Sequence, residues 1–166
     1  MAFFPCIRFE ASILLSFRGQ AKQMAKWNEI QKIEHCIKLH KELDQMYELV
    51  SQLFVIAIRR GLKMIVENPY SKEHYLHRYW CIKPSVIDTN RLERGDYYKK
   101  PTQYWFVNCE PSNNLIMEVA PNNGIAKTIE WVTASSFADK RVKSQRVARS
   151  MIHPDYANRF IREFIL

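Results

Sequence analysis

Apolar side chains recur every three or four residues between about Gln20 and Arg60, a stretch that contains neither proline nor glycine. The positions are Trp27, Ile30, Ile33, Cys36, Leu39, Leu43, Met46, Tyr47, Val50, Leu53, Phe54 and Ala57. This spacing places them in one stripe along a helix and predicts a long amphipathic helix over residues 20–60. Gly61 stands where a helix commonly ends, so we expect the helix to stop there.

Short apolar runs flank this helix on both sides. Residues 2–4 are typical of the end of a strand that Pro5 breaks, and Leu62–Val66 predicts a short buried strand closed by a turn at residues 67–71. A helix that joins two strands in this way forms a βαβ arrangement. We therefore expect a sheet that is partly parallel.

The second half of the chain has a different amino-acid composition. Residues 70–101 are rich in Tyr, His, Arg and Lys and predict loops with a short helix. Three β-type runs follow, separated by turn residues: Thr102–Asn108, Leu115–Ala120 and Thr128–Ala134. Pro154, followed by apolar residues at four-residue steps, predicts a C-terminal amphipathic helix.

These elements predict an α/β fold with a mixed sheet, a long helix and a C-terminal helix. The length of 166 residues favours a single domain over 1–166, in which residues 70–148 form a loop and β region suited to face DNA. Lys and Arg exceed Asp and Glu by 25 to 17, and aromatic residues make up 13%. This balance favours nucleic acid over a membrane as partner, although a basic surface kept for solubility explains the same surplus.

The cysteines are four in number, widely spaced and without a CxxC pair, which indicates reduced thiols in a cytoplasmic protein. The longest uncharged apolar run, Leu53–Ile58, is too short to cross a bilayer, so no membrane partner is expected.

Two short motifs carry candidate chemistry. In "FFPC", Cys6 follows a predicted strand, and in "IVENPYS", Glu67 follows the next one. Both residues are expected at the carboxyl edge of the sheet, where α/β proteins place their chemistry. A thiol nucleophile beside a carboxylate suits attack on an activated ring. Taken singly, each motif is better explained by a structural role, as a buried cysteine or a turn-capping glutamate.

Together with "GDYYKKPTQYWFVNCEP", these motifs resemble the DNA cytosine-5 methyltransferase family in its compact phage and prophage forms. The resemblance assigns the Pro-Cys nucleophile to Cys6 and the Glu-Asn-Pro motif to Glu67, Asn68 and Pro69. It also matches a Gly, a Lys-x-Thr, a Trp and a Pro. The corresponding residues are Gly95, Lys100, Thr102, Trp105 and Pro111. The family's C-terminal pattern is similar to Arg149, Ser150, Pro154 and Ala157.

The resemblance implies that a cytosine is flipped out of DNA and that the Cys6 thiolate adds to C6 of the ring. Glu67 would hold the N3 and amine edge of the base, and Asn68, Pro69, Lys100, Thr102 and Trp105 would form the substrate-binding surroundings. The methyl donor would be S-adenosylmethionine. The sequence lacks the family's Gly-rich cofactor loop, so it resembles the C-terminal portion of such an enzyme, and the resemblance implies a partial Rossmann-like sheet with mixed strands. The cofactor is then expected only where a partner chain completes the site.

Other basic and metal-ligating residues give weaker indications. A basic run is suited to phosphate contacts or to a solvated face: Lys140, Arg141, Lys143, Arg146 and Arg149. Cys36 with His40, and His74 with His77, are spaced like metal ligands, but no third cluster accompanies either pair, so no metal is predicted.

The function that we expect is a methyltransferase-like, DNA-associated protein of phage or prophage origin in a bacterial host cell, inactive by itself. The chain would be one piece of a split enzyme. The alternatives are an anti-defence inhibitor that blocks a restriction or CRISPR nuclease, and a fragment without a function of its own. Self-association, or a partner chain, is expected at the strand edge near residues 2–5.

Overall fold

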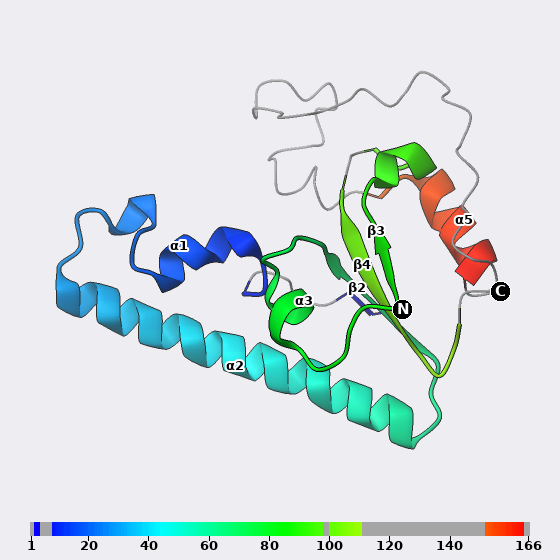
Figure 1. Cartoon of the computed structure of the whole chain (residues 1–166), viewed down its shortest axis with the longest axis horizontal. Coiled ribbons are helices and arrows are strands. Elements are labelled where there is room, and N and C mark those ends of the chain that lie inside the picture. Colours follow the sequence, from blue (N-terminus) through cyan, green and yellow to red (C-terminus); the bar gives the residue numbers. More distant parts are fainter. Residues whose placement is uncertain (1, 4–7, 98–99, 111–151, 165–166) are drawn as a thin grey trace. The chain divides into compact units, whose positions relative to one another are not determined.

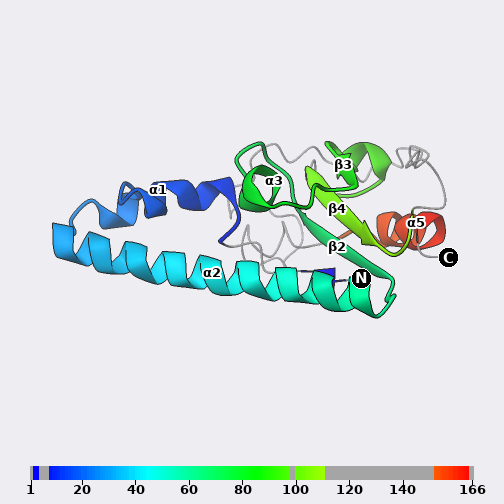
Figure 2. The ribbon, with the colours of Figure 1, turned by 60° about the horizontal axis from the view of Figure 1, so that its bottom comes forward.

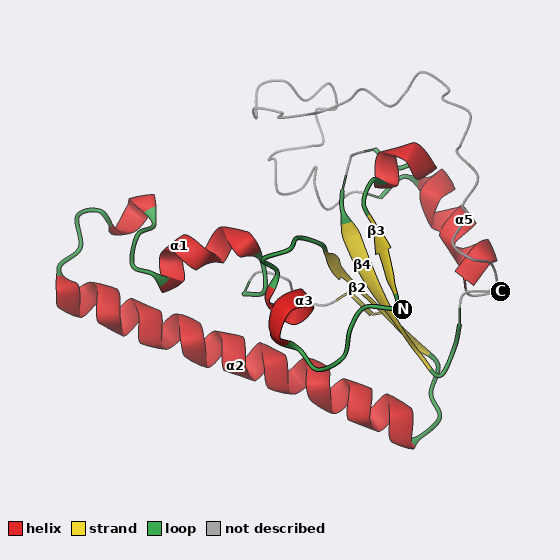
Figure 3. Ribbon diagram, viewed as in Figure 1, coloured by secondary structure: helices red, strands yellow, loops and turns green. Residues whose placement is uncertain are grey.

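The computed structural model describes residues 2–3, 8–97, 100–110 and 152–164 (Figure 1). Two compact units are distinguished within it. Unit 1 comprises residues 1–86 and 103–109, and unit 2 comprises residues 87–102 and 110–166. Figure 3 shows helices and strands in both parts of the chain. The predicted mixture of helices and strands, with a long helix and a C-terminal helix, is therefore confirmed.

The long helix α2 runs from Glu29 to Arg59 and starts later than the apolar spacing predicts. Its first turn is fixed by a capping box: the Asn28 side chain accepts a hydrogen bond from the Gln31 backbone N–H, and the Gln31 side chain accepts one from the Asn28 N–H. Residues 20–28 instead contain a short 3₁₀ helix, η2, at Lys22–Met24. The predicted start at about Gln20 is wrong, because this capping box satisfies the first backbone donors only at Asn28.

The end of α2 is where the sequence predicts it. Gly61 adopts a positive φ of 63°, and the N–H groups of Gly61 and Leu62 donate to the carbonyls of Ile58 and Ala57 at 3.3 and 2.9 Å. This 5→2 and 6→1 pattern is a Schellman motif, which satisfies carbonyls that the helix leaves open. Asn108, at the end of strand β4 (Thr102–Val107), adds hydrogen bonds from its side-chain amide to Ala57 and Leu62. The turn after α2 is thereby attached to the sheet.

The sheet has the strand order β1-β2-β4-β3. β1 (Ala2–Phe3) pairs parallel with β2 (Met64–Pro69), with Ala2 opposite Val66 and Phe3 opposite Glu67. β2, β4 and β3 (Val86–Asp88) form a three-stranded antiparallel sheet. The partly parallel pairing predicted around the long helix is confirmed, whereas a Rossmann-like sheet stays a prediction. β2 begins and ends later than predicted, because Glu67, Asn68 and Pro69 continue the strand instead of forming a turn.

The core of unit 1 lies between α2 and the sheet (Figure 2). Its buried members include Phe9, Leu43, Val50, Phe54, Ala57, Val66, Leu76, Trp80, Trp105 and Val107. Leu76 and Trp80 come from α3 (Tyr75–Tyr79) and the residue that follows it. Trp80 packs edge-on against Phe54 at a centroid distance of 4.6 Å and against Trp105 at 5.6 Å. The predicted apolar stripe of the long helix is thus buried at Leu39, Leu43, Val50, Phe54 and Ala57, and not in the first ten residues of α2.

The first part of α2 lies beside a shorter segment of unit 1. The helix α1 (Leu14–Phe17) runs along it, and both views show the two segments side by side (Figures 1 and 2). The Cys36 thiol lies 3.4 Å from the carbonyl oxygens of Ser16 and Phe17. Gly19, at a φ of 68°, ends this segment beside the stem of Lys32.

Unit 2 holds the C-terminal helix α5 (Pro154–Phe164), which begins at the predicted proline. A short 3₁₀ helix, η3 (Arg91–Arg94), carries the buried Arg91. The guanidinium lies 4.3 Å from the centroid of the Tyr156 ring and 2.7 Å from a carboxylate oxygen of Asp96. The other Asp96 oxygen accepts hydrogen bonds from the backbone N–H groups of Tyr97 and His153. One buried ion pair therefore holds the start of α5 against the loop after η3.

The two β-type runs predicted at Leu115–Ala120 and Thr128–Ala134 lie outside the described residues. In the described ranges, no helix has the length and apolar character needed to cross a bilayer.

Candidate functional site

Glu67 and Asn68 are buried at the carboxyl end of β2. The run Ile65–Asn68 is buried on both faces of the strand, and Asn68 donates its side-chain N–H to the Glu67 carbonyl at 2.9 Å. The pairing of Phe3 with Glu67 places the end of β1 at the same edge. The carboxyl ends of the two parallel strands therefore lie side by side, next to the buried Glu67.

A group of buried polar side chains surrounds the end of β2. Gln103, on β4, donates from Nε2 to the Pro69 carbonyl at 2.8 Å, and the same atom lies 3.1 Å from His74 Nδ1. The amide nitrogen carries only donors, so His74 Nδ1 must accept this bond. The neutral imidazole then carries its proton on Nε2.

Several polar atoms in this group have no hydrogen-bond partner within the described residues. We call the group the β2-end polar cluster and define it by Asn68, Ser71, His74 and Gln103. The unmatched atoms are Asn68 Oδ1, Ser71 Oγ, His74 Nε2 and Gln103 Oε1. Buried polar groups are normally satisfied by protein, water or ligand, and leaving one unsatisfied is costly. The cluster thus holds acceptors and one imidazole donor whose hydrogen bonds are not made among the described residues.

Burial determines the protonation state of His74. Desolvation lowers the pKa of this imidazole from 6.5 to about 4, opposed by the nearby Glu10 carboxylate and reinforced by His77. The imidazole is neutral at pH 7 for this reason, and it offers a hydrogen bond without a charge.

Three other predicted site residues have clear structural positions. Thr102 is buried at the start of β4, where its hydroxyl donates to the Lys100 carbonyl at 2.9 Å. Lys100 itself is half-buried. Trp105 packs in the core of unit 1 and donates its indole N–H to the Ile82 carbonyl at 3.1 Å. The structure brings Glu67, Asn68 and Pro69 together on one strand and places Trp105 on the neighbouring strand.

The remaining predicted site residues lie outside the described part of the chain. They are Cys6, Lys140, Arg141, Lys143, Arg146 and Arg149. Among the residues that are described, no group of three potential metal ligands occurs.

Sequence reasoning misses two members of the cluster as site residues. The sequence indicates His74 only as a metal ligand with His77, and Gln103 stands inside an apolar strand pattern. A polar residue at an otherwise buried strand position is the available indication for Gln103, because buried amides require partners.

Comparison with protein-family models, curated proteins and solved structures gave no match for the chain.

Proposed function

We propose that the chain is the nucleophile-bearing and base-holding portion of a DNA cytosine-5 methyltransferase-like enzyme. One observation carries the proposal: β1 and β2 are parallel neighbours, and Phe3 pairs with the buried Glu67. Cys6 follows Phe3 by three residues, which span at most about 10 Å of chain. A thiol and a carboxylate within such reach are the pair that the Pro-Cys and Glu-Asn-Pro motifs require.

The proposed reaction of the chain's own residues is an addition. The Cys6 thiolate forms a bond to C6 of a cytosine, the C5–C6 double bond breaks, and its electron pair moves to C5. Glu67 holds the N3 and amine edge of the base and stabilises the charge that the ring gains. The β2-end polar cluster surrounds the carbonyl end of this strand with neutral hydrogen-bonding groups. Expulsion of the thiolate reverses the addition.

The methyl donor does not fit this chain. The glycines are Gly19, Gly61, Gly95 and Gly124, and their scatter cannot form the loop through which a backbone approaches S-adenosylmethionine. In the proposal, another polypeptide supplies the donor site, and DNA supplies the base. β1 pairs with β2 at one end of the described strand order, so a strand of that polypeptide would pair beside β1.

A donor-independent trap tests the proposal. Duplex DNA that carries a pyrimidin-2-one in place of cytosine lacks the amine and is more electrophilic at C6, so a positioned thiolate adds to it without methyl transfer. Incubation with the full chain is expected to give a covalent protein–DNA adduct, and peptide mass spectrometry is expected to place it on Cys6.

The controls use residues of the same chain. Cys81 is an exposed free thiol and reports random reactivity, so an adduct spread evenly over Cys6 and Cys81 would refute the proposal. Cys6→Ser is expected to abolish the adduct. Glu67→Gln is expected to slow its formation by roughly 10²-fold, the usual scale of a lost proton-transfer or charge-stabilising group. Unchanged adduct formation in Glu67→Gln would remove that residue from the proposed role.

A further inference from the structure

A groove of about 690 Å³ lies between the N-terminal half of α2 and the segment that ends at Gly19. Its floor is apolar. Phe17, Cys36, Ile33 and Ile37 line it, and the Phe17 ring meets the His40 ring edge-on at 4.8 Å. The side chains of Ile33 and Ile37 remain 59% and 51% exposed, although Leu39 on the opposite face is buried. The groove is thus an apolar surface left open along a helix.

The open apolar row extends past the groove. Ile30 precedes Ile33 and Ile37 at helical spacing and is also exposed. Three isoleucines at positions i, i+3 and i+7 form a continuous ridge along one side of the helix. Such a ridge is the complement of an apolar face on a second helix.

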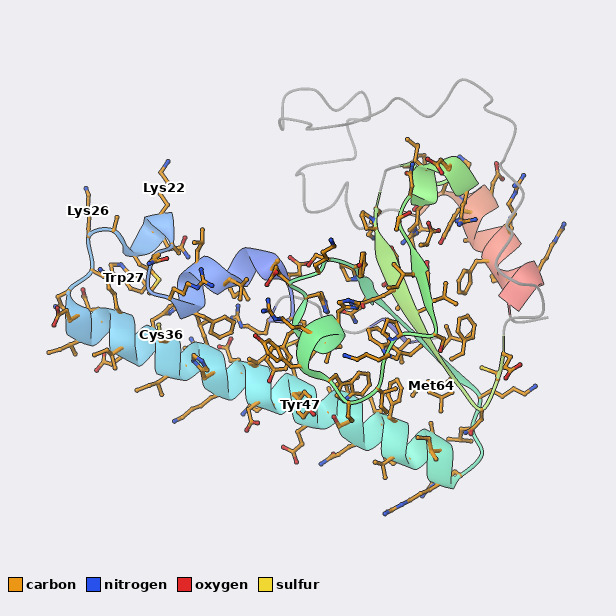
Figure 4. All side chains as sticks on the ribbon, in the orientation of Figure 1. Lys22, Lys26, Trp27, Cys36, Tyr47 and Met64 are labelled. Carbon is orange, nitrogen blue, oxygen red and sulfur yellow. The ribbon has the colours of Figure 1, made fainter. Side chains whose placement is uncertain are left out.

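Cations surround the apolar floor. Arg18, Lys32 and Lys41 line the groove, and Glu29 is the acidic residue among the lining side chains. In the part of the chain that the structure describes, none of these three cations forms an ion pair. Lys22 and Lys26, in the segment before α2, project away from that helix and do not line the groove (Figure 4). The rim is therefore positive around an apolar centre.

We infer that this groove binds an amphipathic helix of another polypeptide, with an apolar face flanked by Asp or Glu residues. The isoleucine ridge matches the apolar face, and the cations match the acidic flanks. A second copy of the chain is disfavoured because its formal net charge is +8. The segment 111–151 carries three acidic and six basic residues, so its charge does not complement the rim. Phosphate groups of DNA would meet the cations but leave the apolar ridge in water. The inference does not depend on the proposed addition chemistry.

The test uses three labelled peptides of about 18 residues, which span about 27 Å as a helix. One carries a leucine face with glutamate flanks, one the same face with lysine flanks, and one the acidic composition in scrambled order. Fluorescence anisotropy with the full chain is expected to show binding of the ordered acidic peptide, about tenfold or more tighter than either other peptide. Its affinity is expected to fall as salt is added.

Variants locate the binding. Ile33→Ser combined with Ile37→Ser is expected to weaken binding about tenfold or more, and Lys32→Glu combined with Lys41→Glu is expected to do the same. Ile58→Ser and Lys63→Glu are matched controls, since both residues are exposed at the far end of α2 or just beyond it, and both should bind like wild type. Circular dichroism confirms that each variant is folded.

Three results would overturn the inference: absence of binding by the ordered acidic peptide, equal binding of the scrambled peptide, or groove variants that bind like wild type. Duplex DNA provides the remaining arm. DNA binding that is lost in the lysine variants and kept in the isoleucine variants, without peptide binding, would assign the rim to phosphates instead.

Discussion

Gln103 Nε2 lies 3.1 Å from His74 Nδ1, and the same nitrogen donates to the Pro69 carbonyl at 2.8 Å. One amide thus joins the end of β2 to the residue that precedes α3 and fixes the tautomer of a buried imidazole. The contact is entirely buried, so His74 Nδ1 depends on Gln103 for its hydrogen bond. Both the stability and the pH response of unit 1 are expected to depend on it.

Replacing Gln103 by Leu keeps the volume and removes the amide. The Pro69 carbonyl and His74 Nδ1 then lose their donor in a buried place, and we expect unfolding to become easier by about 2 kcal/mol. Urea denaturation followed by circular dichroism measures this loss. Gln52→Leu is the matched control, because Gln52 is exposed on α2 and, among the described residues, its side chain bonds to Glu48. A loss of equal size in both variants would contradict the role of the buried amide.

His74 predicts a specific pH dependence of stability. Its pKa is about 4 in the folded chain and about 6.5 when unfolded, so the unfolded state binds more protons between these values. The stability that the neutral imidazole provides is complete above about pH 6.5 and declines as the pH falls toward 4. The decline amounts to about 3 kcal/mol.

Urea midpoints measured between pH 4 and 7 test this dependence. His74→Gln is expected to flatten the profile in that window, whereas Gln52→Leu should keep the wild-type profile. NMR titration of the His74 ring provides an independent measurement, and a midpoint near 6.5 in the folded chain would refute the prediction.

Arg91 is expected to be the most sensitive position of unit 2. Arg91→Met leaves the Asp96 carboxylate buried without its cation and also removes the contact with the Tyr156 ring, at a cost of about 3–5 kcal/mol. Arg78→Met removes an ion pair with Glu73 whose side chains are about half exposed, and should cost under about 1 kcal/mol. Thermal denaturation of the two variants compares them, and similar melting temperatures would show that the buried pair is not a determinant of stability.

Gly61→Ala tests the turn after α2. A methyl group added to Gly61 would meet open space, with no atom beyond its chain neighbours and its own helix backbone within 4 Å. The expected loss of about 1 kcal/mol therefore comes from the positive φ and not from a clash. Gly61→Asn should lose less, because asparagine tolerates this conformation better. Urea denaturation measures both losses, and an Ala variant as stable as wild type would show that the turn rearranges without cost.

The sequence predicts which helices and strands occur better than it predicts where they start or which buried polar side chains contact one another. The apolar stripe, Gly61 and Pro154 correctly indicate α2, its end and the start of α5, because each acts through local geometry. The start of α2 is not predicted correctly, because the apolar spacing continues upstream of the capping box at Asn28. The contact between Gln103 and His74 is not predicted because 29 residues separate them in the sequence. Only the adjacency of β2 and β4 brings them into contact.

The exposed isoleucines of α2 are a second feature that the sequence pattern does not predict. Ile33 belongs to the stripe that predicts burial, yet it is exposed, because it lies about 100° around the helix from the side that carries the buried Leu43 and Val50. Periodicity describes which side of a helix is apolar, and packing against the rest of the chain determines how much of that side is covered.

The 31 residues of α2 span about 46 Å, but its buried residues begin only at Leu39. Amide hydrogens in the later turns are expected to exchange with solvent only when unit 1 unfolds, whereas those after Asn28 should exchange through local opening, which only the capping box and the contacts with the α1 segment restrain. The helix thus carries a gradient of amide protection along its length. A helix bound over Ile33 and Ile37 would slow exchange in the first turns and leave the later turns unchanged.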